Sequence, residues 1–152
     1  QGIKFCSFPS SFDEMVPIIG KDLMEGQYHS SFAAYRTDME KYPELEVALR
    51  MSAGKKWGEE KPSVTYLGGW YTGLGLAEAI RLAIEKVGLE NVTGWDVRDA
   101  YVTIKDFDLL WALPATVTES TPWVNDYVQI GEIQGGEPVA VTEWIPGVSA
   151  WE

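Results

Sequence analysis

The sequence contains one histidine, His29, and one cysteine, Cys6, and these two residues could together perform nucleophilic chemistry. A thiol becomes a strong nucleophile when an imidazole within hydrogen-bond reach takes its proton and a third group orients that imidazole. Both residues fall in segments that we predict to be strands, so the pair requires neighbouring strands in a matching register. We favour the alternative, in which a small buried thiol and a histidine on another strand have unrelated roles.

Other familiar catalytic patterns are absent from the sequence. A single cysteine and a single histidine cannot complete a Cys₄ or Cys₂His₂ zinc site. None of the 23 Asp and Glu residues lies alone in an apolar setting that would raise its pKa for acid–base catalysis. The glycine-rich run at 68–75 has no GxGxxG in the right register and no following Lys-Ser/Thr, so close packing explains it better than phosphate binding. We therefore predict no catalytic residue, no metal site, no cofactor and no enzymatic activity.

The strongest candidates for ligand binding follow two predicted strands. Ser7, Phe8 and Ser10 lie at the end of the first strand, and Phe32 lies at the end of the second. In open α/β sheets ligands bind beyond the carboxyl ends of the strands, and hydroxyls beside an aromatic ring suit a small ligand with polar and apolar parts. The structural alternative is that these residues serve as helix caps and turn residues.

Composition excludes several classes of partner. Twelve Lys and Arg against 23 Asp and Glu give a net charge of −11, which argues against nucleic acid and against an anionic membrane surface. A chain of 152 residues with 45% hydrophobic and 23% charged residues is typical of one globular domain. No run of 18 apolar residues occurs, so we predict no insertion into a membrane. The chain begins at Gln1 without Met, and we expect it to be part of a longer protein.

The elements that position these residues begin with a strand, a helix and a second strand. Residues 3–8 and 27–33 are predicted to be adjacent parallel strands, joined by a helix at 11–23. The helix is expected to start at a Ser11–Glu14 capping box. Its apolar residues, at helical spacing along one stripe, are Phe12, Met15, Val16, Ile19 and Leu23.

A block of helices and a hairpin follow. We predict helices at 44–57, at 76–87 after the glycine-rich run, and after a capping box formed by Thr93 and Asp96. Two strands, 126–134 and 137–144, flank the hairpin turn Gly135-Gly136. The predicted fold class is therefore α/β: a βαβ unit, a helical block and a C-terminal β-hairpin. The apolar stripe expected to bury the 76–87 helix comprises Leu76, Ala77, Ile80, Ala83, Ile84 and Val87.

An ordered set of motifs resembles one protein family. The set begins with Tyr-Leu-Gly-Gly-Trp at 66–70 and Ala-Glu-Ala-Ile at 77–80, followed by Val-Arg-Asp-Ala at 97–100. It continues with Lys-Asp-Phe-Asp at 105–108, Leu-Pro-x-Thr-Val-Thr at 113–118 and Val-Thr-Glu-Trp-Ile at 141–145. Together these motifs resemble the C-terminal part of a type I periplasmic substrate-binding protein, of the branch that serves branched-chain amino acid ABC importers.

This resemblance implies a two-lobed fold that closes on a ligand. Residues 1–34 would end the second lobe, 35–108 would return to the first lobe as helices, and 109–152 would form a crossing segment with the C-terminal hairpin and tail. Relatives bring aromatic residues toward the cleft near Tyr66 and Trp70. Relatives often place an acidic residue after the first strand, where this chain has none. The resemblance implies a small amino acid-like ligand. Because this acidic residue is missing, the resemblance also leaves open an aromatic acid or amide.

The function implied is that of a periplasmic or extracellular solute-binding component, with import carried out by a membrane ABC permease. The other partner expected is the missing N-terminal half of the fold or a second copy of the chain, which would cover the sheet edges and helix faces left open. An alternative from another class is a sensory or regulatory ligand-binding domain of a receptor. A third hypothesis is the small Cys–His hydrolase.

Overall fold

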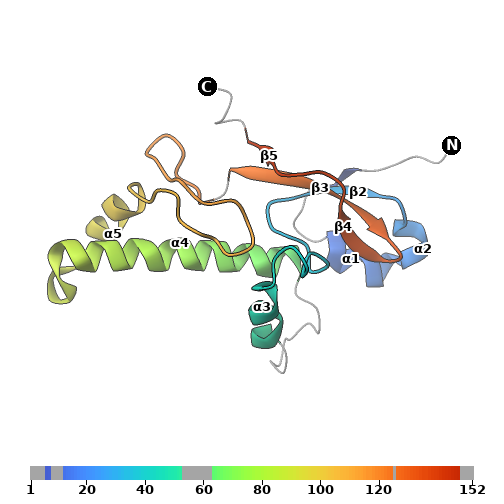
Figure 1. Cartoon of the computed structure of the whole chain (residues 1–152), viewed down its shortest axis with the longest axis horizontal. Coiled ribbons are helices and arrows are strands. Elements are labelled where there is room, and N and C mark those ends of the chain that lie inside the picture. Colours follow the sequence, from blue (N-terminus) through green and yellow to red (C-terminus); the bar gives the residue numbers. More distant parts are fainter. Residues whose placement is uncertain (1–5, 8–11, 53–62, 125, 148–152) are drawn as a thin grey trace.

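The computed structural model describes residues 6–7, 12–52, 63–124 and 126–147, and it contains one mixed β-sheet beside a long helix (Figure 1). The sheet has the strand order β1-β2-β3-β4, and a short β5 pairs with the first residues of β3. Only β1 and β2 are parallel, and the other pairs are antiparallel. The strands are β1 (Cys6–Ser7), β2 (Tyr28–Ser31), β3 (Tyr127–Gln134), β4 (Glu137–Ala140) and β5 (Ile145–Pro146).

The parallel pairing of the first two strands confirms the predicted βαβ unit. Cys6 pairs with Tyr28 and Ser7 pairs with His29. The connection contains α1 (Phe12–Ile19) and α2 (Lys21–Met24) in place of the one helix predicted at 11–23. Gly20 separates them with a backbone φ of +103°, a conformation that favours glycine and ends a helix. Ser11, the predicted cap, lies outside the described residues.

The predicted apolar stripe of this connection is only partly buried. Val16 and Met24 pack with Ile133 of β3 in a small cluster. Ile19 is 43% exposed and Leu23 is 72% exposed, so the prediction that they face the core is wrong. The break at Gly20 interrupts the helical period, and residues on α2 no longer continue the stripe of α1.

The predicted hairpin is confirmed and has a central place in the sheet. Gly135 and Gly136 have φ values of +63° and +85°, as a two-residue type I′ turn requires, and Gln134 pairs with Glu137. Because β3 pairs with β2 on one side and with β4 on the other, the hairpin extends the sheet of the βαβ unit. Residues from both ends of the chain therefore build one layer.

The helical block extends away from this sheet. It contains α3 (Leu45–Ser52), α4 (Val64–Val87), the short 3₁₀ turn η1 (Leu89–Asn91) and α5 (Gly94–Tyr101). Ser63 caps α4 by accepting a hydrogen bond from the backbone N–H of Tyr66, and the predicted capping box of Thr93 and Asp96 is confirmed. In Figure 1, α4 runs from beside the sheet to the far end of the molecule, where α5 lies against it.

Helix α4 includes the whole glycine-rich run and buries a different face from the one predicted. Leu76 is 49% exposed and Ile80 is 39% exposed, so the predicted stripe is wrong at these positions. The side facing the protein carries small residues, and Gly75 lies directly against Val124 and Tyr101. The loop after α5 can approach α4 closely only on this side. The buried residues of α4 are Val64, Leu67, Tyr71, Gly75, Ala79 and Ala83.

The sheet and α4 share a core built around the segment that follows β2. Ala33, Ala34 and Tyr35 have no exposed surface. They form the main hydrophobic cluster with residues of α3, α4 and the loop after α5, among which Leu67 and Trp111 are also fully buried. Two segments therefore connect the sheet to the helices, residues 32–44 and residues 102–126, and we call them the first and second crossing segments.

Gly131 on β3 provides space for two aromatic rings. It pairs with His29 across the sheet, and the rings of His29 and Tyr35 meet edge to face with centroids 5.1 Å apart. A Cβ atom at position 131 would lie 2.5 Å from Tyr35 Oη and 2.8 Å from His29 Cε1. Because both rings are fully buried, neither can move aside without disturbing the core.

We expect Gly131→Ala to lower the free energy of unfolding by about 1–3 kcal/mol, since it overpacks the contact between His29 and Tyr35. The matched control is Gly69→Ala, because a Cβ at Gly69 meets no atom within 4 Å and the site is inside a helix. This change is expected to raise stability by roughly 0.5–1 kcal/mol. Urea denaturation of both variants measures the difference, and equal stabilities would contradict this account of the packing.

Candidate functional site

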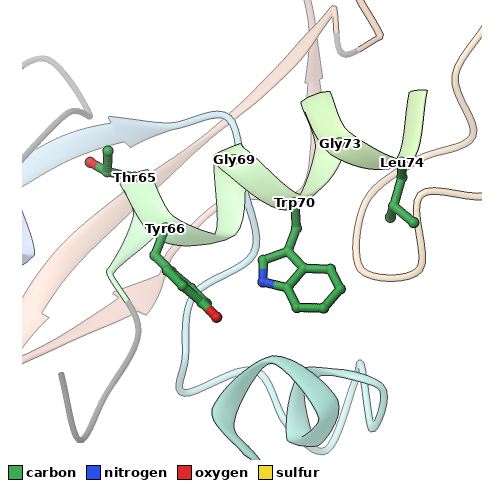
Figure 2. Close-up of a pocket in the computed structure, with 6 residues that line it drawn as sticks. All are labelled: Thr65, Tyr66, Gly69, Trp70, Gly73 and Leu74. Carbon is green, nitrogen blue, oxygen red and sulfur yellow. The ribbon is translucent and has the colours of Figure 1, made fainter. Parts of the chain in front are cut away.

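Two of the six predicted ligand residues line a common groove on α4. Tyr66 and Trp70 share it with Thr65, Gly69, Gly73 and Leu74, and its volume is about 490 Å³. Figure 2 shows both aromatic rings on one side of the helix. Residues 66, 69, 70 and 73 follow the i, i+3, i+4, i+7 spacing that places side chains on one helical face.

The groove owes its shape to the missing side chains of two glycines. A Cβ atom at Gly69 or Gly73 would meet nothing within 4 Å, so the helix backbone itself is open to an approaching group. Trp70 also contacts the core, because its ring lies edge-on to Trp111 with the centroids 5.8 Å apart. Tyr66 is 36% exposed. The groove thus combines one aromatic ring fixed by the core with one exposed ring.

Phe32 contacts α4 on a different face. A Cβ atom at Gly68 would overlap the ring of Phe32, which shows that this ring packs directly on the helix backbone. Gly68 and Gly69 are neighbours in the helix, and successive helical residues point about 100° apart. Phe32 is not among the residues that line the groove of Tyr66 and Trp70. The structure therefore separates Phe32 from these two aromatic residues.

The hydroxyl residues after the first strand are only partly described. Ser7 lies in β1 opposite His29, whereas Phe8 and Ser10 lie outside the described residues. At the last residue of β2, the Ser31 hydroxyl donates a 2.6 Å hydrogen bond to the carbonyl oxygen of Ala33, which is a local contact. Of the predicted set, the structure brings together Tyr66 and Trp70.

The strand register argues against the Cys–His hydrolase. Cys6 pairs with Tyr28 while His29 pairs with Ser7, so the register does not make Cys6 and His29 cross-strand partners. His29 is fully buried, and this burial lowers its pKa from 6.5 to about 4. Within the part of the chain that the structure describes, no group of three His, Cys, Asp or Glu residues could hold a metal ion.

The sequence analysis missed the residue that links the two crossing segments. The Tyr71 hydroxyl accepts a hydrogen bond from the Ala34 N–H at 3.2 Å and donates one to the Trp111 carbonyl oxygen at 3.0 Å. Burial raises the pKa of Tyr71 well above its usual range, so the hydroxyl keeps its proton. A tyrosine at a position on the buried face of a helix indicates a hydrogen-bonded hydroxyl, because a buried phenol needs a hydrogen-bond partner.

The first crossing segment is also attached to the far edge of the sheet. Arg36 forms a 2.8 Å ion pair with Glu137, and the Thr37 hydroxyl donates to the Pro138 carbonyl oxygen at 2.6 Å. Beyond β4, the Trp144 indole N–H donates to the Tyr42 hydroxyl oxygen at 2.9 Å. The segment therefore contacts the sheet along its length and contacts α4 through Ala34.

Comparison with known proteins identifies this arrangement. No family model matches the chain, and no curated protein matches it. Among solved structures, 97% of the chain superposes with a TM-score of 0.80 and 21% identity on 40% of a branched-chain amino acid ABC transporter from Thermus thermophilus with bound valine. The chain has part of the type I periplasmic-binding-protein fold.

Two further structures show the same periplasmic-binding-protein fold. A leucine-binding protein from Thermotoga maritima matches 91% of this chain over 35% of its own length, with a TM-score of 0.60 and 13% identity. An extracellular ligand-binding receptor from Rhodopseudomonas palustris matches 86% over 38% of its length, with a TM-score of 0.57 and 21% identity. The chain thus spans well under half of each. The fold expected from the motifs is confirmed, and these neighbours are binding proteins rather than enzymes.

Within the described ranges, none of the helices combines the length and the apolar character needed to cross a membrane.

We expect Tyr71→Phe to lower the free energy of unfolding by about 1–3 kcal/mol, because it leaves the buried Ala34 N–H and Trp111 carbonyl without their partner. Tyr66→Phe removes the same atom from an exposed ring and serves as the control, with an expected change within about 0.5 kcal/mol. Denaturant unfolding of the two variants measures the effect. Equal losses in both would show that the hydroxyl of Tyr71 does not stabilise the crossing segments.

We expect acid to destabilise the fold partly through His29. The folded protein holds this imidazole neutral down to a pH of about 4, whereas the unfolded chain protonates it below its ordinary pKa of 6.5. The free energy of unfolding should therefore fall as the pH decreases from 6.5 toward 4. In His29→Gln this part of the slope should disappear. Identical slopes in denaturation measurements of both proteins would contradict the assignment.

Proposed function

We propose that the chain is part of the extracytoplasmic solute-binding component of an ABC transporter, in the periplasm or outside the cell. One observation carries the proposal: 97% of the chain superposes at a TM-score of 0.80 on a branched-chain amino acid ABC transporter that holds valine. Its partners are then a small solute and the membrane permease of the transporter. The solute is an amino acid-like molecule or an aromatic acid or amide. The sequence from Ser7 to Ser10 has no acidic residue to pair with an ammonium group, and this favours the aromatic acid or amide.

The mechanism is closure of two lobes about the crossing segments. We assign residues 1–34 to the end of the second lobe, residues 35–108 to the helices that return to the first lobe, and residues 109–152 to a crossing segment with the C-terminal hairpin and tail. Ligand contacts on both sides stabilise the closed state over the open one, and the permease recognises closure. Backbone around Ala34 and Trp111 must bend in this motion, and Tyr71 holds the two segments together at that point.

The ligand-facing surface combines the ends of the strands with the start of α4. We assign contacts to Ser7 in β1, to Phe8 and Ser10 next along the sequence, and to Phe32, which packs on α4 at Gly68 away from the groove. Tyr66 and Trp70 provide an apolar aromatic wall for the side chain of the solute, supported by the groove that they line.

The part of the fold that this chain lacks supplies the second wall of the ligand-binding cleft. The match covers 40% of the Thermus chain, so most of that chain has no counterpart here. Helix α4 exposes Leu76 at 49% and Ile80 at 39%, and α1–α2 expose Ile18 at 75% and Leu23 at 72%. Large exposed apolar surfaces recruit a partner. We assign this role to the N-terminal half of the fold or to a second copy of the chain.

A receptor function is the second candidate, and the match to an extracellular ligand-binding receptor favours it. Receptor domains of this fold use the same lobe closure but transmit it to a signalling partner. The coding sequence that surrounds the chain distinguishes the two functions. A membrane-spanning helix there favours signalling, and a secretion leader or lipid-anchored cysteine favours import.

The test uses the whole protein, in which this chain is joined to the rest of the fold. Branched-chain amino acids, aromatic acids and aromatic amides are titrated into it and binding is measured by calorimetry. We expect one class to bind with micromolar affinity and Trp70→Ala to weaken it at least about tenfold. Leu89→Ala, on the exposed turn η1, is the control and should leave affinity unchanged. No binding across the panel would contradict the function. Unchanged binding in a folded Trp70→Ala would contradict the placement of the ligand against α4.

A further inference from the structure

A second cavity, of about 460 Å³, lies where the second crossing segment reaches β3. It is separate from the groove of Tyr66 and Trp70, with which it shares no lining residue. The segment folds back on itself between α5 and β3 (Figure 1). The polar and aromatic side chains that line the cavity are Asp106, Asp126, Thr116, Thr118, Thr121, Trp123 and Tyr127.

The walls of this cavity are held in place by the crossing segment itself. Phe107 and Ala115 exchange backbone hydrogen bonds of 2.9 and 2.7 Å across the segment. The Val117 N–H donates to the Ile104 carbonyl oxygen at 2.9 Å, and both side chains are buried against α4. These contacts fix the walls of the cavity, which lowers the ordering cost of binding a ligand there.

Two carboxylates line the cavity, Asp106 exposed and Asp126 half-buried. Neither Asp106 nor Asp126 forms an ion pair with any residue that the structure describes, and Lys, Arg and His are missing from the described lining. Asp106 is 3.5 Å from the Thr116 hydroxyl, which is its one side-chain contact among the described residues. With a net charge of −11, the rest of the protein attracts cations further.

The other lining residues favour an organic cation over a metal ion. Trp123, which is 51% exposed, and Tyr127 line the cavity beside the two carboxylates, and aromatic rings attract ammonium groups. Among the described residues, no group of three Asp, Glu, His or Cys side chains that could hold a metal ion occurs. A volume of about 460 Å³ lies within the range for small-molecule sites.

We propose that this cavity binds a small organic cation with a primary or quaternary ammonium group, held between Asp106 and Asp126 and against Trp123. All of these residues belong to the present chain, so the proposal does not depend on the solute-binding function or on the rest of the fold. Such a site would give the protein a second ligand, independent of the one in the interlobe cleft.

In the experiment, tetramethylammonium and n-butylammonium are titrated into the protein and binding is measured by calorimetry. The controls are n-butanol, a neutral probe, and butyrate, an anionic probe, both of similar size. We expect saturable one-to-one binding of the two cations and none of the other probes. Asp126→Asn and Trp123→Leu should each weaken binding at least about fivefold. Asp106→Asn should act likewise, since Asn tolerates the φ of +50° at this position.

The matched control is Asp22→Asn, which removes the same charge from an exposed position on α2. Its affinity should stay within about twofold of the unmodified chain, because a distant surface charge is screened by salt. Equal weakening by Asp22→Asn would show attraction by net charge alone and would overturn the proposal. Saturable binding of Ca²⁺ or Mg²⁺ that displaces the ammonium probes would also overturn it. So would the absence of ammonium binding to a chain whose circular dichroism spectrum shows that it is folded. If this proposal fails, the proposed binding of a solute in the cleft between the lobes is not affected.

Discussion

The hydroxyl oxygen of Tyr71 is the contact through which the sheet and the helices become one structure. It satisfies the N–H of Ala34 and the carbonyl of Trp111, two buried backbone groups that lie outside the strands. Unpartnered groups at that depth would cost free energy, so the path of both crossing segments past α4 depends on this one side chain. The surrounding core residues, including Tyr35 and Leu67, fill the space that this path leaves.

Small residues on α4 make that path possible. Phe32 packs on the backbone at Gly68, and Val124 packs at Gly75, so each crossing segment touches the helix where a side chain is missing. The same composition leaves the opposite face with bulky apolar groups and an open groove. One helix thus has an inner face suited to close chain crossings and an outer face suited to another layer of protein.

Features set by short-range interactions could be predicted from the sequence, and features set by distant segments could not. The Gly135-Gly136 turn and the Thr93 capping box depend on adjacent residues, and both were predicted. The buried face of α4 depends on where residues 102–126 return, about which the helix itself carries no information. In the candidate site, helical spacing placed Tyr66 beside Trp70. Asp106 and Asp126 are twenty positions apart in an acidic sequence, so their place in one cavity could not be predicted from the sequence.

The position of β3 affects how the described sheet folds. This strand comes from the last part of the described sequence, yet it separates β2 from β4 at the middle of the sheet. Without β3, the described strands β1 and β2 form only a two-stranded ribbon, and such a ribbon is barely stable in water. The ion pair of Arg36 with Glu137 likewise joins residues that are 101 positions apart. The sheet therefore depends on contacts of large sequence separation, which must close a long loop before they stabilise it and which slow folding.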